Sequence, residues 1–154
     1  MAQYLVRHAK AGSRSGWIGP DESRPLTRAG KEQAEAIMEL LVERPVPRTL
    51  SSPYRRCVET MQPLAEKLGL PIETVVELAE GEPAWRVVEL LAALPEDSVL
   101  CSHGDVIPAV IDALAARGMA VDGEPDWRKG VTWVLERDGD EFVRAHALPP
   151  PATP

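Results

Sequence analysis

Short apolar runs alternate with longer stretches of helical periodicity along this 154-residue chain. An apolar run at residues 4–6 predicts a strand, and the Gly- and Pro-bearing residues 9–26 that follow predict a long loop. Thr27 can cap a helix, which Pro45 stops. The apolar positions of this helix follow the three- and four-residue spacing of one helical face: Ala34, Ile37, Met38 and Leu41.

The same alternation continues towards the end of the chain. A short strand is predicted at residues 48–51, followed by a helix over residues 54–68, in which Pro63 predicts a kink or a fresh helical start. An Asp138-Gly139 turn between two strand-forming runs predicts a β-hairpin. Between these parts the predicted order is strand, helix, strand, helix, at residues 72–76, 87–94, 98–102 and 107–114.

Strands that alternate with amphipathic helices indicate βαβ units and a three-layer α/β/α fold, with a mainly parallel central sheet and a C-terminal β-hairpin. We expect one domain over residues 1–148, followed by a disordered Pro-rich tail at residues 149–154. In such sheets ligands bind beyond the carboxyl ends of the strands. His8, the turn at residues 51–56 and His103 all follow predicted strands, so the fold should bring them to one edge.

Charge and composition narrow the partners of this fold. A formal charge of −7 argues against nucleic acid or an anionic membrane as a partner, but not against a small anion held by a local arginine cluster. No apolar stretch reaches about 20 residues and no signal-like segment is present, so we expect a cytoplasmic protein. Cys57 and Cys101 fall in predicted core elements, where reduced, buried thiols are expected.

Positive and titratable side chains gather at the predicted strand ends. Guanidinium groups suit the oxygens of a phosphate, and the helix starts after Ser52 and Gly104 offer free amides to the same anion. A neutral imidazole can attack phosphorus once arginines neutralise the surrounding charge, and this chemistry requires no metal or cofactor. The residues that carry this prediction of a phosphoryl site are Arg7, His8, Arg55 or Arg56, and His103.

Four motifs follow one another along the chain: "LVRHAKAG", "RPLTRAGKEQA", "SSPYRRCVET" and "SHGD". Together they resemble the ordered motifs of the histidine phosphatase superfamily, whose fold is described as phosphoglycerate-mutase-like. Among its branches they look most like the small bacterial members, which are the SixA-type phosphohistidine phosphatases and the similar domain often fused to a Nudix hydrolase. The resemblance extends from Leu5 to about Ile107, and it is specific because four elements recur in order.

The resemblance implies a role for each of the central residues. His8 would be the nucleophile that becomes phosphorylated, while Arg7, Arg56 and His103 would hold the phosphate. Loop cations add to this set, because Arg14, Arg24 and Arg28 lie in or beside residues 9–26 and can reach a substrate there.

Arg56 is preferred over Arg55 because the family's arginine stands four places after the serine that is Ser52 here. Spacing agrees with this choice, since neighbouring helical side chains point about 100° apart and only one of the pair can face the site directly. The further substrate-binding residues that we expect are Arg55, Ser52, Gly104 and Arg14.

The wider family often supplies a leaving-group acid after the third strand, in a Leu-x-Glu context. Glu80 stands in such a context here and is the first candidate for the acid. However, the Gly- and Trp-containing stretch usual after that glutamate is reduced to residues 81–85, and some small members lack the acid. Glu82 and Asp105 are therefore kept as alternatives, as is a site without an acid.

These inferences favour a phosphohydrolase that works through a phosphohistidine intermediate, on a phosphohistidine protein or a small phosphorylated metabolite. The alternatives are a non-catalytic member that binds a phosphorylated ligand, and a mutase of the phosphoglycerate type. A cysteine-dependent phosphatase is excluded, because the positions six places after the two cysteines hold Pro63 and Ile107 instead of arginine. The sequence contains neither a G-x-x-x-x-G-K-[ST] loop nor a zinc-binding spacing, and it leaves the oligomeric state open.

Overall fold

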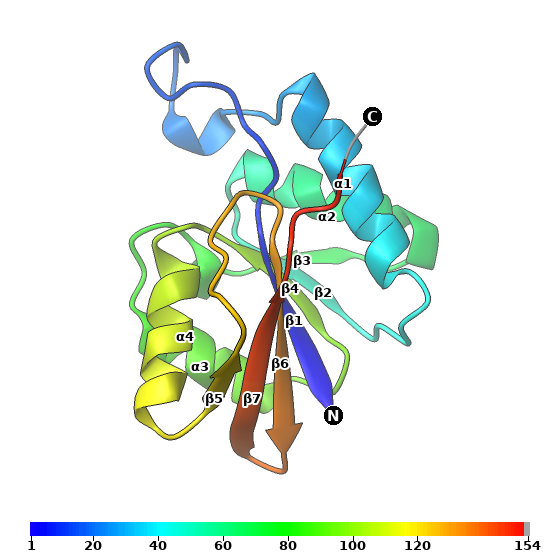
Figure 1. The fold of residues 1–154 in the computed structure, drawn as a ribbon. Helices are drawn as coiled ribbons and strands as arrows, with labels where there is room; N and C mark the ends of the chain where they lie inside the picture. Colours follow the sequence, from blue (N-terminus) through cyan, green and yellow to red (C-terminus); the bar gives the residue numbers. More distant parts are fainter. Residues whose placement is uncertain (153–154) are drawn as a thin grey trace.

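The computed structural model describes residues 1–152, which form a seven-stranded sheet between two layers of helices (Figure 1). The strands are β1 Ala2–Arg7, β2 Thr49–Ser51, β3 Ile72–Thr74, β4 Val99–Ser102, β5 Ala120–Asp122, β6 Thr132–Asp138 and β7 Glu141–Leu148. The helices are α1 Arg28–Leu41, α2 Arg55–Leu68, α3 Ala84–Ala93 and α4 Val106–Ala116, with short 3-10 turns at Asp21–Ser23 and Val76–Leu78. Residues 149–152 have no regular secondary structure, and residues 153–154 of the expected tail lie outside the described residues.

The sheet has the strand order β3-β2-β4-β1-β6-β7-β5. Only β6 runs antiparallel to its neighbours in the described sheet, so the predicted, mainly parallel α/β architecture is confirmed. The predicted hairpin is confirmed too, but Asp138 pairs with Glu141, so the turn residues are Gly139 and Asp140. This turn lies one residue later than expected, because Gly139 takes its positive φ of 61° at the first turn position.

Alternating side chains of β1 supply both cores, as expected for a sheet that is covered on its two faces. Tyr4 and Val6 pack with apolar side chains of α1 and α2, whereas Leu5 packs with those of α3 and α4. Figure 1 shows these two helix pairs on opposite sides of the sheet. None of the helices within residues 1–152 has the length and apolar character needed to span a bilayer.

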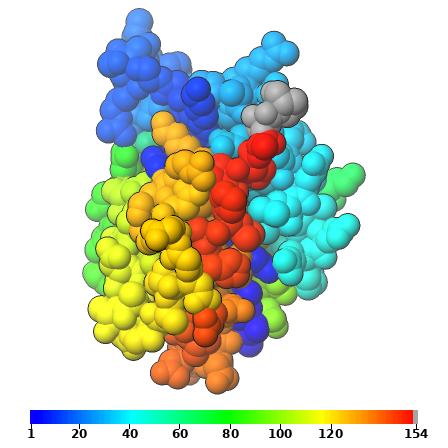
Figure 2. All heavy atoms as spheres, viewed as in Figure 1, coloured from blue at the N-terminus to red at the C-terminus, as the bar shows by residue number. Residues whose placement is uncertain are grey.

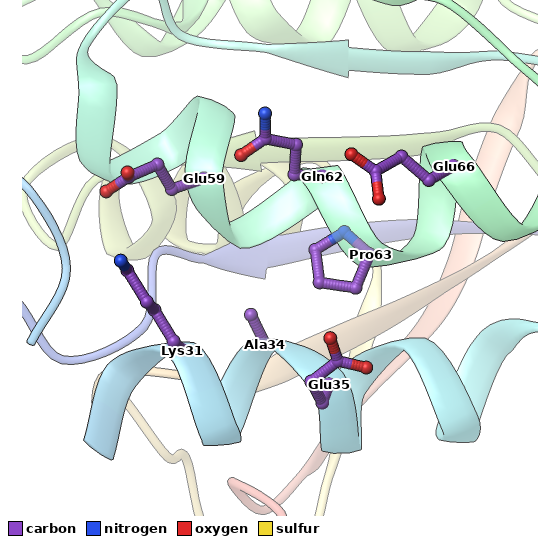
Figure 3. A pocket seen from close by; sticks show the side chains of 7 residues that line it. All are labelled: Lys31, Ala34, Glu35, Glu59, Gln62, Pro63 and Glu66. Atoms are coloured by element: carbon purple, nitrogen blue, oxygen red, sulfur yellow. The ribbon is translucent and has the colours of Figure 1, made fainter. Parts of the chain in front are cut away.

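Helices α1 and α2 begin and continue as their sequences dictate. Thr27 caps α1, because its hydroxyl accepts a hydrogen bond from the Gly30 amide at 3.0 Å. Helix α2 is continuous through Pro63, so the expected fresh helical start is wrong. Figure 3 shows Pro63 on the side of α2 that faces α1, near Ala34, beside a cavity of about 240 Å³ that contains none of the predicted site residues.

The loop between β1 and α1 stands above the carboxyl end of the sheet. In Figure 1 it rises from the end of β1, and Figure 2 shows it as a raised ridge at the top left of the molecule. Its two ends are joined to each other, because the Thr27 amide donates to the Lys10 carbonyl at 3.0 Å and Ala11 forms an isolated bridge with Leu26. The Ala9 amide attaches the loop to α2 by donating to the Thr60 hydroxyl at 2.9 Å. The loop therefore borders the edge at which β1, β2 and β4 end.

Candidate active site

Strands β1 and β4 bring two distant histidines together. Arg7 pairs in register with Ser102, and the His8 amide donates to the Ser102 carbonyl at 3.1 Å. The rings of His8 and His103 consequently lie edge to face, with centroids 5.4 Å apart. The predicted meeting of these two strand ends is thus realised in the fold.

A cavity of about 320 Å³ opens beside these strand ends. This volume is at the lower end of the range for small-molecule sites, which is about 300–1,000 Å³. The residues that line the cavity are Arg7, His8, Ala11, Gly12, Ser13, Arg14, Arg24, Arg56, Glu80, Gly104, Asp105 and Lys129. Several elements far apart in the chain therefore contribute to one hollow.

His8 is only 5% exposed and is held in one tautomer by its own backbone. Its Nδ1 lies 2.8 Å from the carbonyl oxygen of Ala9, and because a carbonyl can only accept, Nδ1 carries the proton and Nε2 keeps its lone pair. Burial and, to a smaller extent, positively charged neighbours together lower the pKa of His8 from 6.5 to about 3, against the opposing hydrogen bond to Ala9. The ring is therefore neutral at pH 7, which is the form that a nucleophile requires.

Arg56 and Arg55 point in different directions from the first turn of α2. The Arg56 guanidinium is buried and donates to Asp21 twice, to its carbonyl at 3.0 Å and to its carboxylate at 3.1 Å. Arg55 instead pairs with Glu59 at 3.3 Å and does not line the cavity, contrary to its expected role in substrate binding. The turn of about 100° between adjacent helical residues separates the two guanidinium groups.

Arg7 lies flat against the backbone of Gly104. One of its amino groups donates to the Trp127 carbonyl, and a Cβ atom on Gly104 would lie 2.5 Å from the Arg7 Cζ atom. Only glycine fits at this position with Arg7 in place, because real Cβ atoms do not approach another heavy atom so closely. The "SHGD" motif therefore positions an arginine as well as a histidine.

Replacing Gly104 with alanine should displace Arg7 and weaken anion binding. We expect the Kd for inorganic phosphate, measured by calorimetry, to rise about tenfold, which is the size of one charged hydrogen bond. Gly16→Ala is the matched control, since its added Cβ would meet nothing closer than 3.7 Å. Equal phosphate affinity in Gly104→Ala and Gly16→Ala would contradict the packing of Arg7 on Gly104.

His103 is buried behind the cavity and does not line it. Its Nε2 lies 2.8 Å from the Ser52 hydroxyl, so Ser52, expected to touch substrate, is a partner of His103 instead. Within residues 1–152 three buried nitrogens around His8 have no hydrogen-bond partner, and they are Arg7 Nε, Arg56 Nε and His103 Nδ1. Nitrogens on two guanidinium groups and one imidazole suit the oxygens of a phosphoryl group.

The three candidate acids have different surroundings. Glu80 lines the cavity, but its carboxylate accepts from Arg14 at 2.9 Å and lies 3.6 Å from Arg56. Asp105 also lines the cavity and accepts from the Gly81 amide at 2.8 Å. Glu82 pairs with Arg86 at 3.3 Å and does not line the cavity.

Sequence reasoning missed Asp21, Thr60 and Lys129. Asp21 lies within 3.0 Å of Arg24, 3.1 Å of Arg56 and 3.6 Å of Arg14, so one loop carboxylate joins three cations. Thr60 accepts from the Ala9 amide at 2.9 Å and thereby fastens the turn after His8 to α2. No local pattern marks these residues, because their partners come from other parts of the chain.

Arg24 is 6% exposed and lines the cavity, whereas Arg28 is an exposed residue that lies 3.9 Å from Glu32 on α1. The loop therefore supplies two arginines, Arg14 and Arg24, to the cavity, and the third candidate does not reach it.

The chain is similar to known proteins both in sequence and in structure. Residues 3–83 match the family model described as "Histidine phosphatase superfamily (branch 1)". An "8-oxo-(d)GTP phosphatase" of Mycolicibacterium smegmatis is 35% identical over 154 residues, an alignment that covers 96% of this chain and 48% of that protein. The chain thus spans about half the length of this curated relative.

Solved structures share the fold at low identity. The protein histidine phosphatase SixA complexed with tungstate has a TM-score of 0.77 and 22% identity, covering 94% of this chain and 96% of that one. The alpha-ribazole phosphatase from Shigella flexneri has a TM-score of 0.68 and 19% identity, covering 93% of this chain and 94% of that one. These structures have the same three-layer architecture as the present chain.

Proposed function

Because this chain belongs to the histidine phosphatase superfamily, we propose that it is a phosphohydrolase in which His8 receives the phosphoryl group and then passes it to water. One observation carries the proposal. The buried, neutral ring of His8 keeps the lone pair of Nε2 and lines a cavity together with Arg7 and Arg56.

In the first step, His8 Nε2 attacks the phosphorus in line while the bond from phosphorus to the leaving oxygen, or to the leaving nitrogen of a phosphohistidine, breaks and its electron pair stays on the leaving atom. Arg7 and Arg56 donate to the oxygens of the transferred group and neutralise charge that spreads over them. His103, held by Ser52 at 2.8 Å, lies beside the attacking ring. In the second step, water attacks phospho-His8, inorganic phosphate leaves and the neutral ring returns.

The acid candidates favour substrates with good leaving groups. Glu80 lines the cavity, and its carboxylate contacts Arg14 and Arg56. To protonate a leaving group, Glu80 would have to break its ion pair with Arg14. Asp105, bonded to the Gly81 amide, is the second candidate for the same role. Phosphohistidine proteins and small phosphorylated metabolites both fit this proposal, and the name of the M. smegmatis relative adds nucleotides to the substrates worth testing.

A substrate panel tests the proposal. We expect phosphate release from p-nitrophenyl phosphate, and from at least one of a phosphohistidine protein, a nucleotide or a sugar phosphate. Phosphate binding without turnover of any panel member would instead identify a non-catalytic member of the family. Isomerisation of phosphoglycerate without net phosphate release would identify a mutase.

A further inference from the structure

The cavity holds more positive charge than the transfer of one phosphoryl group uses. Its lining contains five cations, Arg7, Arg14, Arg24, Arg56 and Lys129, and two carboxylates, Glu80 and Asp105. Arg7 and Arg56 serve the transferred group in the proposed function, and Arg14 pairs with Glu80. Arg24 and Lys129 therefore have no part in that chemistry.

Lys129 comes from the segment between β5 and β6 and faces other cations. The charged groups that act on it are Arg7, Arg24, Lys10 and Arg56. Lys129 is an exposed residue whose ammonium group is partly desolvated, and this desolvation, followed by the positive neighbours, lowers its pKa. Side chains of like charge repel one another, so an anion placed among them would remove an unfavourable interaction.

Arg24, which lines the same cavity, is held by two hydrogen bonds. Its Nε donates to the Asp21 carboxylate at 3.0 Å, and its Nη1 donates to the Gly12 carbonyl. The buried guanidinium is thereby oriented before any ligand arrives, with Nη2 outside both of these hydrogen bonds. Preorganised donors of this kind cost little entropy on binding.

We propose that Arg24 and Lys129 bind a second phosphoryl group of the substrate, bonded through a bridging oxygen to the group that His8 receives. The site would then accept phosphoanhydrides, namely nucleoside diphosphates or inorganic pyrophosphate. This inference rests on the proposed function and names its substrate class. The cavity volume of about 320 Å³ is compatible with a ligand larger than a single phosphate.

The chemistry of an anhydride matches the acid candidates. His8 Nε2 bonds to the terminal phosphorus, the bond to the bridging oxygen breaks, and the electron pair stays on that oxygen. The second phosphate leaves as an anion, whose charge Arg24 and Lys129 neutralise in place of a proton. Water then cleaves the bond between Nε2 and phosphorus, releasing inorganic phosphate and a proton, and Glu80 can stay with Arg14 throughout.

Lys129→Met tests the subsite, with Lys67→Met as the matched control on the exposed last turn of α2. The readout is the ratio of kcat/KM for ADP, and separately for pyrophosphate, to kcat/KM for p-nitrophenyl phosphate. We expect this ratio to fall about tenfold in Lys129→Met, as for loss of one charged hydrogen bond, and to stay constant in Lys67→Met. If the unmodified protein cleaved ADP but not pyrophosphate, its anhydride substrate would be a nucleotide.

An unchanged ratio in Lys129→Met would overturn the subsite, as would an unmodified protein that cleaves only the monoester. A protein that cleaves nothing contradicts the proposed function instead, and binding then decides on the subsite. In calorimetry, Lys129→Met should raise the Kd of pyrophosphate by about tenfold more than it raises the Kd of phosphate. An equal rise in Kd for the two anions would overturn the proposal even in the absence of turnover.

Discussion

Replacing His8 with alanine is expected to lower kcat/KM for p-nitrophenyl phosphate by about 10⁴-fold or more, since removing a covalent nucleophile has effects of this order. The arginine side chains of the cavity stay protonated and His103 is not part of the lining, so none of these side chains can substitute for Nε2. The same change should abolish trapping of labelled phosphate in an acid-labile, alkali-stable form on the protein.

His146→Ala is the matched control for His8→Ala. His146 lies on β7, opposite Val134 of β6, and does not line the cavity. We expect this variant to turn over within a factor of two of the unmodified protein. If His8→Ala kept more than a tenth of the activity, or still trapped label, the nucleophile would have to be another group.

Gly30→Ala is expected to destabilise the protein by about 3 kcal/mol, at the upper end of the usual cost of overpacking. An added Cβ at Gly30 would lie 1.9 Å from the carbonyl oxygen of Lys10, which is backbone and cannot rotate away. That oxygen also accepts from the Thr27 amide at 3.0 Å and lies 3.2 Å from its hydroxyl. Relieving the clash therefore separates α1 from the turn that follows His8.

Equilibrium unfolding in urea measures this loss, with Gly12→Ala as the comparison. Gly12 has nothing within 4 Å of the position that its Cβ would take, so its replacement should change the free energy of unfolding by less than about 1 kcal/mol. Activity of Gly30→Ala should fall as well, because residues 8–10 move with the clash. A free energy of unfolding equal to that of Gly12→Ala would mean that the helix accommodates the methyl group.

The elements that sequence predicts well are those with long periodic patterns and local end signals. Helix α1 has a cap at Thr27 and four apolar positions on one face, and it forms as expected. Strand β5, at Ala120–Asp122, was not predicted, because its three residues are exposed or half-buried and carry no alternation. It exists through parallel pairing with β7, which no local pattern records.

The same division applies to the site. The choice of Arg56 over Arg55 follows from motif spacing and helical geometry, both of which are readable in the sequence. Asp21 begins a short 3-10 turn in a long loop, and Lys129 comes from an irregular segment. The course of both segments depends on distant contacts, such as that between Arg7 and the Trp127 carbonyl. Side chains in such segments enter a site through tertiary structure alone.

The hydrogen bond between the His8 ring and the carbonyl of Ala9 has a consequence for how such a site diversifies. Its acceptor is main chain, so no exchange of a neighbouring side chain can delete it. Side chains that line the cavity can therefore be replaced to suit new leaving groups, by natural selection or by engineering, while the lone pair of His8 Nε2 stays available for attack. Substrate preference can thus change through side chains, while the reactivity of His8 depends on a main-chain atom.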